Sequence, residues 1–389
     1  MMHSTYVTHT GIPLQLESKP LKRGGEGTIH RVTGGGTEEL LAKIWHKPEK
    51  ALKAHQRLQW MINNSPVASA TQAVKNAIIW PRHLLFGQGR FAGFTMPPVH
   101  EGIKLFSLIQ AGFPQHNLGK EWDTFQLPWG LNPRLVAGYN LAQAVHFLHQ
   151  TGKFMLVDMK PENILVKPNG HISLIDLDSI QVSEKGVLLF PATAFTPEYA
   201  PPELHNKKIA TLSGVARSYD LFSMAAILYQ ILLAVHPFQA SHPKNTTLHE
   251  NIMQGLWVHG PRKDELHRIP QLHNPYTNLP AALQTLFEKT FVAGHADPAS
   301  RVAADEWARA LLTAIRMTPR VKPRPRKKAA PSAKTAAKKS SAATAPKRRK
   351  THTQVNQHIT TTHTCIELRE EGVNITLGGN LMVQIKFWK

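Results

Sequence analysis

Residues 158–163 read DMKPEN and residues 174–179 read LIDLDS, which sets Asp176 eighteen positions after Asp158. Transfer of a phosphoryl group needs a carboxylate that orients the acceptor hydroxyl and a metal ion that neutralises the phosphates. Asp158 can supply that carboxylate, while Asn163 and Asp176 offer the hard oxygen ligands that Mg²⁺ prefers. The two motifs together therefore predict a site for phosphoryl transfer.

These motifs resemble those of the eukaryotic-like Ser/Thr protein kinase family, and the resemblance extends over about residues 14–316. The family's catalytic loop reads HRDLKPEN, where residues 156–163 read LVDMKPEN, and its DFG motif is replaced by DLD at residues 176–178. The sequence IDLDS of residues 175–179 is similar to the metal-binding loop of a divergent bacterial branch of the family. The resemblance implies an α+β, two-lobed fold, with a small β-rich N-terminal lobe and a larger helical C-terminal lobe.

The resemblance also assigns roles to the polar residues of both motifs. It implies that Asp158 is the catalytic base and that Lys160 stabilises the transferred phosphate. It makes ATP the phosphate donor, with Asn163 and Asp176 as the ligands of Mg²⁺. Lys160, together with Thr196, is typical of kinases that phosphorylate Ser or Thr rather than Tyr in their protein substrates.

A glycine-rich stretch lies upstream, where residues 22–29 read KRGGEGTI. Glycines allow backbone N–H groups to approach phosphates closely. The stretch is similar to the family's glycine-rich loop, although Lys22 stands where the family has its first glycine. The residues that would bind ATP in this stretch are Gly24, Gly25, Gly27 and Ile29.

Lys43 lies in the apolar, strand-like sequence LLAKIW, and by resemblance it is the catalytic lysine that binds the α- and β-phosphates of ATP. In the family this lysine pairs with a glutamate on the next helix. Here Glu49 follows too early, and the helix-like stretch 51–62 contains no acid. We expect either that Gln56 or Gln59 substitutes for the glutamate or that the pairing is lost.

The adenine ring leaves a weaker trace, because kinases bind it through backbone groups. Residues 91–95 read as a strand, and the sequence MPPV follows it. By resemblance this sequence is the hinge, with Met96 near the gatekeeper position and with Pro98 and Val99 beside the adenine.

Residues 196–203, which read TPEYAPPE, match the end of the family's activation segment. The resemblance implies a buried ion pair between Glu203 and Arg301, and it implies that Asp220 braces the backbone of the catalytic loop. Val157 stands where the family has an arginine that binds a phosphorylated activation loop. We therefore predict activity without activation-loop phosphorylation.

Periodicity and composition divide the chain into three parts. Apolar residues at helical spacing predict a helix over residues 133–150, and the nearly uninterrupted apolar residues 219–235 predict a helix buried on all sides. We expect a kinase domain at residues 14–316, a basic disordered linker at 317–350 and a small β-rich segment at 351–389.

The basic linker holds much of the formal net charge of +20, because residues 319–350 contain thirteen Lys and Arg and no acid. Such a segment can bind nucleic acid or another anionic surface through its charge. It can equally be a solvated linker, and the sequence does not decide between these two interpretations. It contains no aromatic residues, so stacking on nucleic-acid bases is not expected.

The location of the protein is predicted only indirectly. The chain has a single cysteine, no secretory signal at its N-terminus and no apolar run long enough to span a membrane. We expect a cytoplasmic protein.

A second interpretation is that the chain has the kinase fold but does not catalyse phosphoryl transfer. Leu156, Val157 and Asp178 depart from the family's motifs, and the glutamate for Lys43 is missing, as in a pseudokinase that serves as a nucleotide-binding scaffold or regulatory module. The residues that would touch phosphate, metal and acceptor are all present, which favours an active enzyme.

Overall fold

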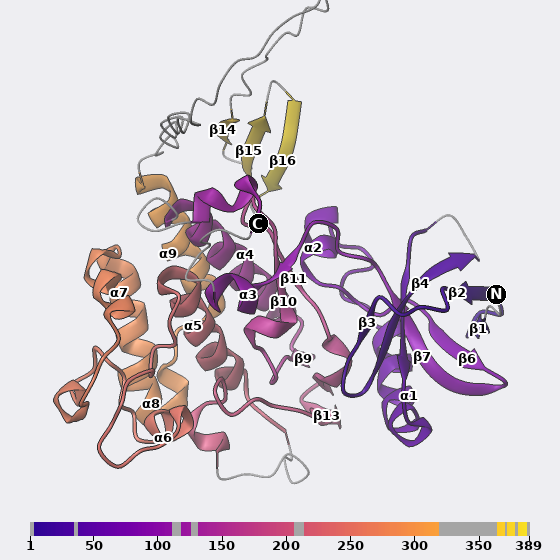
Figure 1. The fold of residues 1–389 in the computed structure, drawn as a ribbon, viewed down its shortest axis with the longest axis horizontal. Helices are drawn as coiled ribbons and strands as arrows, with labels where there is room; N and C mark the ends of the chain where they lie inside the picture. Colours follow the sequence, from indigo (N-terminus) through magenta and orange to yellow (C-terminus); the bar gives the residue numbers. More distant parts are fainter. Residues whose placement is uncertain are drawn as a thin grey trace, which may run out of the picture. The chain divides into compact units, whose positions relative to one another are not determined.

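A computed structural model describes residues 4–34, 38–110, 118–125, 131–205, 214–318, 364–369, 372–377 and 380–386. The chain divides into two compact units, residues 1–323 and 324–389. The first unit contains both lobes of the fold that the sequence predicts, and Figure 1 shows its largest group of strands on the right and most of its helices on the left.

The N-terminal lobe is one antiparallel sheet of seven strands in the order β2-β1-β6-β7-β5-β4-β3, and a further pairing joins β2 to β4. Its strands are β1 (Ser4–Thr8), β2 (Pro13–Leu16), β3 (Lys22–Arg23), β4 (Gly27–Gly34), β5 (Leu41–Trp45), β6 (Leu84–Gly87) and β7 (Arg90–Met96).

Two helices, α1 (Pro48–Asn63) and α2 (Gln72–Ala77), interrupt the order of these strands along the chain. Helix α1 buries Ala51, Ala54 and Leu58 against a cluster that includes Trp45 and Phe94. Burial of this apolar face, at roughly 25 cal/mol per Å², fixes the helix against the sheet. It places the helix beside the strand that carries Lys43.

The C-terminal lobe is built around α5 (Arg217–Leu233), in which every residue from Asp220 onward is buried. The helix ends at Ala234, which adopts a left-handed conformation with a φ of 61°. The other helices of this lobe are α3 (Leu105–Gln110), α4 (Leu131–Gln150), α6 (Leu248–Met253), α7 (Ala281–Glu288), α8 (Gly294–Ala296) and α9 (Ala304–Met317).

Two small antiparallel sheets are formed by strands from the part of the chain between β7 and α5. One has the order β11-β10-β8 and the other β13-β12-β9. Their strands are β8 (Ile103–Lys104), β9 (Phe154–Met155), β10 (Ile164–Val166), β11 (Ile172–Leu174), β12 (Gln181–Glu184) and β13 (Val187–Phe190).

The observed elements confirm the two-lobed, kinase-like fold. The helix predicted over residues 133–150 is α4, and the fully buried helix predicted over residues 219–235 is α5, which ends two residues earlier. No helix in the described residues is both long enough and apolar enough to cross a membrane.

The second unit contains an antiparallel sheet of three strands in the order β14-β15-β16. These strands are β14 (Thr364–Arg369), β15 (Gly372–Leu377) and β16 (Asn380–Lys386). The predicted linker and the start of the predicted β-rich segment lie almost entirely outside the described residues, so the predicted domain boundaries stay predictions.

Candidate active site

The backbone of the catalytic loop is held by hydrogen bonds to the carboxylate of Asp220, a residue of α5. Asp220 is fully buried, and its two oxygens accept hydrogen bonds from the backbone N–H groups of Leu156 and Val157, each at 2.8 Å. His149, at the end of α4, lies 2.8 Å from the same carboxylate. The predicted brace is confirmed, whereas the part of His149 in it was not predicted.

Two residues of the site adopt a backbone conformation that is costly for a residue with a side chain. Val157 has a φ of 62° and Asp176 a φ of 63°, both in the left-handed region. Such conformations cost about 1–3 kcal/mol each and persist only where the surroundings impose them. They set the directions of the chain on either side of Asp158 and after Asp176.

Asp158, Lys160 and Thr196 form a closed triangle of contacts. Lys160 Nζ lies 2.9 Å from Asp158 Oδ2 and donates a hydrogen bond to Thr196 Oγ1 at 2.8 Å. The hydroxyl of Thr196 donates in turn to Asp158 Oδ1 at 2.6 Å. Charge-assisted contacts of this length hold a carboxylate in one orientation.

Asn163 and Asp176 come from consecutive segments that are tied together by the backbone. Asn163 ends a short 3₁₀ helix, η2 (Pro161–Asn163), and its Nδ2 donates to the carbonyl of Asp158 at 3.2 Å. Its own carbonyl accepts from the N–H of Ile175 at 2.9 Å, directly before Asp176. The side chain of Asp176 is 51% exposed, so its oxygens are accessible to a ligand.

Lys43 reaches from β5 across to this segment of the C-terminal lobe. Its side chain is only 10% exposed, and Nζ lies 2.6 Å from Asp176 Oδ1. The same ammonium donates to both oxygens of Asp178, at 2.8 and 2.9 Å. Lys43 is thereby brought into contact with Asp176, which lies 133 positions away in the sequence, and with Asp178, which lies 135 positions away.

The electrostatics of this group follow from burial and from the shared charge. Burial disfavours the ammonium of Lys43, but Asp178 and Asp176 outweigh burial and raise its pKa above the usual value. Burial likewise opposes ionisation of Asp176, yet Lys43 holds the pKa of Asp176 below its ordinary value. Burial raises the pKa of Asp178 against the pull of Lys43. Two carboxylates share one ammonium, an arrangement that a divalent cation would complement.

Of the two expectations stated for Lys43, the loss of the pairing with a helix glutamate is the one that the structure shows. Asp178 of the metal loop binds the ammonium instead, and Gln56 and Gln59 are both exposed on α1 and do not substitute for the glutamate. Glu49, the acid of that helix, is exposed in its first turn. The sequence held one signal for this arrangement, which is the aspartate at the family's glycine position.

The glycine-rich stretch forms the turn between β3 and β4. The N–H of Gly24 donates to the carbonyl of Gly27 at 2.8 Å, and Ile29 pairs with Lys43 across the sheet. A Cβ at Gly27 would come within 2.3 Å of the carbonyl oxygen of Ile44, so only glycine fits there. At Gly25 a Cβ would meet nothing within 4 Å.

The predicted hinge residues follow the last strand of the N-terminal sheet. Met96 ends β7 and packs against the cluster under α1. Pro98 and Val99 are half-buried in the connection to the C-terminal lobe. Val99 and Leu165 of β10 both lie next to Gly102, since each has an atom 3.2 Å from the Cβ position of that glycine. Leu165 was not predicted, because an apolar strand residue carries no mark of its neighbours.

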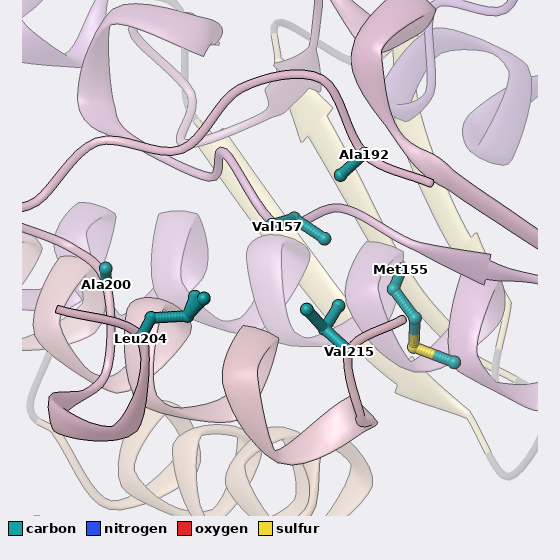
Figure 2. Close-up of a cluster of buried hydrophobic side chains, with 6 residues drawn as sticks. All are labelled: Met155, Val157, Ala192, Ala200, Leu204 and Val215. Carbon is teal, nitrogen blue, oxygen red and sulfur yellow. The ribbon is translucent and has the colours of Figure 1, made fainter. Parts of the chain in front are cut away.

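The activation segment is held by apolar contacts at the position of the missing arginine. Val157 is buried in a cluster with Met155, Ala192 and Ala200, and Figure 2 shows their side chains converging from three separate segments. Leu204 and Val215 complete this cluster, which we call the activation-segment cluster. It occupies the place where the resemblance implies a charged pocket.

The end of the segment is fixed by the predicted ion pair. Glu203 accepts two hydrogen bonds from Arg301, at 2.6 and 2.7 Å, in a bidentate arrangement. The guanidinium has no exposed side-chain surface and also donates to the carbonyls of Gly294 and Ser218. Breaking a buried pair of this kind costs about 3–5 kcal/mol. The pair therefore serves the fold.

The protein kinase domain family matches residues 135–359 of the chain, which is more than half of its length. Two curated relatives are eukaryotic. CBL-interacting protein kinase 24 of Oryza sativa subsp. japonica is 29% identical over 161 residues, covering 39% of this chain and 34% of the relative. The Rho-associated protein kinase let-502 of Caenorhabditis briggsae is 23% identical over 240 residues, covering 60% and 18%.

A solved structure agrees with the observed architecture. The structure titled "ROP18 kinase domain in complex with AMP-PNP and sucrose" has a TM-score of 0.55 at 18% identity and covers 81% of this chain and 85% of its own. At this identity the likeness concerns the fold alone. The chain spans about a third or less of the length of the two curated relatives.

Proposed function

The chain belongs to the protein kinase family, and from this premise we propose that it is an ATP-dependent protein kinase that phosphorylates Ser or Thr. The observation that carries the proposal is the cross-lobe contact of Lys43 with Asp176, at 2.6 Å, in the same site as the triangle around Asp158. A lysine, a metal-binding carboxylate and a base are the groups that phosphoryl transfer uses.

The donor set suits magnesium. Asp176 offers a largely accessible carboxylate and Asn163 an amide oxygen, and Mg²⁺ binds few protein oxygens while it keeps several waters. When bound, the ion neutralises the charge of the phosphates. We assign Asn163 and Asp176 as its ligands.

The remaining roles belong to side chains of the two lobes. Lys43 binds the phosphates from the N-terminal lobe, under the turn that contains Gly24, Gly25 and Gly27, and Ile29 lies opposite it. On the C-terminal lobe, Asp158 accepts the proton of the acceptor hydroxyl. The hinge residues Met96, Pro98 and Val99 line the adenine site in this proposal.

The acceptor is a Ser or Thr hydroxyl because of the contacts around the base. Lys160 contacts both Asp158 and Thr196, so its ammonium stands next to the carboxylate that receives the proton. A cation at this place stabilises the charge of the phosphate during transfer. The protein substrate is therefore recognised at the side of the site that is bounded by Thr196.

The second candidate is a pseudokinase that binds nucleotide and regulates a partner. The departures at Leu156, Val157 and Asp178 favour it. The first two are buried, apolar and braced by Asp220, and the third contacts Lys43, so all three have structural partners that are compatible with catalysis.

Three finer predictions remain part of the proposal. The likeness of residues 175–179 to a bacterial branch still rests on sequence, and the relatives reported above are eukaryotic. Binding of residues 319–350 to nucleic acid rests on their charge alone, and their charge does not decide between that role and a solvated linker. A cytoplasmic location likewise rests on the sequence alone. Binding by the linker should weaken steeply with salt.

The experiment uses γ-labelled ATP, Mg²⁺ and the full chain, alone and with a Ser/Thr-containing protein. We expect label on Ser or Thr with the wild type and a loss of at least about 100-fold with Asp158→Ala, the usual contribution of a positioned base. Nucleotide affinity is measured alongside and should be retained. Equal labelling by both proteins, or label on Tyr alone, would contradict the proposal; binding without labelling would support the pseudokinase.

A further inference from the structure

Lys43 can act on phosphates only if its ammonium is held in place, and the family resemblance provides a helix glutamate that this chain lacks. Helix α1 has Glu49 as its one acid, and that side chain is exposed in the first turn of the helix. Both oxygens of Asp178 contact Lys43 Nζ instead. Resting on the proposed function, we propose that Asp178 is the positioning residue that holds Lys43 for phosphate binding.

Asp178 is better suited to this role than Asp176, which also contacts the ammonium. The side chain of Asp178 is 8% exposed, whereas that of Asp176 is 51% exposed. The exposed carboxylate is accessible to a metal ion, and the buried one faces Lys43 with both oxygens. Asp176 is thus left to bind the metal while Lys43 keeps a partner.

Asp178 contacts Lys43 from an element other than α1. Asp178 lies on the 3₁₀ helix η3 (Leu177–Ser179), next to the metal loop. The buried polar residue that α1 does contribute is a cation, Arg57, whose Nη1 donates to the carbonyl of Pro191 at 3.1 Å. Helix α1 therefore contacts the activation segment through the guanidinium of Arg57, and the acid that pairs with Lys43 comes from the metal loop.

This arrangement has a consequence for regulation. Where a helix supplies the acid, a movement of the helix breaks the ion pair and switches the enzyme off. Here neither partner of the ion pair belongs to α1, because Lys43 lies on β5 and Asp178 on η3. Helix α1 packs against both elements, so a movement of α1 would act on the pair through packing and would not carry the acid away.

The test is a double-mutant cycle on equilibrium binding of Mg²⁺·ATP to the full chain, with wild type, Lys43→Met, Asp178→Asn and the double variant. Residues of one salt-bridge network are coupled, so each single variant should bind about tenfold more weakly and the double variant no more weakly than Lys43→Met. The matched control is Glu49→Gln, which removes the acid of α1 and should leave the affinity unchanged.

Two outcomes overturn the proposal. If Asp178→Asn binds Mg²⁺·ATP as tightly as the wild type, the contact of Asp178 with Lys43 is not needed for nucleotide binding. If the losses of the two single variants multiply in the double variant, Asp178 acts independently of Lys43, as a second metal ligand would.

The experiment distinguishes a loss of ATP binding caused by unfolding of a variant from one caused by loss of the contact with Lys43. The cycle is repeated with Asp178→Glu, which keeps the charge and changes the reach, so that an unstable Asn variant does not end the test. A loss seen only when Lys43 is present supports the proposal, and a loss that persists with Lys43→Met contradicts it. Failure of the wild type to transfer phosphate would defeat the proposed function and still leave the binding cycle readable.

Discussion

Thr196 illustrates how a single hydroxyl can organise a reactive site. It lies 38 positions from Asp158 in the sequence, accepts a hydrogen bond from Lys160 and donates one to the carboxylate of Asp158. The two charged side chains also contact each other at 2.9 Å. The orientation of Asp158, the proposed base, therefore depends on a residue that receives no proton in the proposed reaction.

Replacing this hydroxyl should slow turnover. We expect Thr196→Val to lower kcat about tenfold or more, because a hydrogen bond to a charged group contributes about 1.5–3 kcal/mol. The KM for ATP should change little, since Thr196 contacts no residue of the glycine-rich turn in the described structure. Steady-state kinetics measures both, and Thr196→Ser is the control that keeps the hydroxyl. A Val variant with wild-type kcat would show that the triangle does not orient the base.

Single residues also mark the limit of what the sequence predicts. Asp158, Lys160, Asn163 and Asp176 could be assigned because their spacing within two short motifs is local. The contact of Asp178 with Lys43 crosses 135 positions and both lobes, so no spacing rule contains it. An aspartate at a glycine position was visible, but its partner was not.

At the scale of elements, the glycine-rich turn depends on how closely β4 approaches β5. The Cα of Gly27 faces the backbone of Ile44, where a Cβ would meet the carbonyl oxygen at 2.3 Å. At 3.0 Å or less the backbone must shift, and here the neighbour is backbone as well. The turn above the proposed phosphate site is thereby fixed by packing at one of its glycines.

Replacing Gly27 and Gly25 by alanine, one at a time, distinguishes a steric effect of the added Cβ from a loss of backbone flexibility. We expect Gly27→Ala to lower Tm, with a destabilisation of about 1–3 kcal/mol typical of overpacking, and to weaken ATP binding by displacing the turn. Gly25→Ala meets nothing within 4 Å and should leave Tm within a degree or two of the wild type. Calorimetric unfolding of both variants checks this. Equal Tm values for the two variants would contradict the account of the turn.

Helices rich in apolar residues were the best predicted from sequence. The helices α4 and α5 have buried residues throughout their length, and both lie close to the ranges expected for them. The partner expected on α1 was wrong because periodicity identifies which face of a helix is buried and not what that face contacts. The buried face of α1 carries Arg57 beside apolar residues.

Across the whole kinase-like unit, the activation segment joins elements of the C-terminal lobe through the activation-segment cluster. Val157 contributes an apolar side chain from the catalytic loop, and Ala192 and Ala200 contribute theirs from the segment itself (Figure 2). Arg57 of α1 reaches the same segment at Pro191. Apolar burial does not depend on phosphorylation, so the segment has contacts that hold it in its unmodified state.

We therefore expect that the enzyme is active without phosphate on this segment. The triple variant Ser179→Ala, Ser183→Ala and Thr193→Val removes the hydroxyls between the metal loop and Thr196. Its kcat should stay within about threefold of the wild type, in keeping with the small effects of substitutions that remove no key contact. Activity of protein purified after phosphatase treatment is the measurement. Loss of activity in the triple variant would show that a phosphorylated hydroxyl is required.

The contact between the lobes carries the central claim, which is that the side chains around Lys43 and Asp176 form one site for magnesium and ATP. The most direct measurement is the affinity for ATP by calorimetry, with Mg²⁺ and with EDTA, for wild type and Asp176→Asn. We predict that Mg²⁺ tightens binding to the wild type about tenfold or more, as expected where a metal ion neutralises phosphates, and that it has little effect on the variant. The same affinity with and without Mg²⁺ in the wild type, or no binding of ATP, would contradict the account.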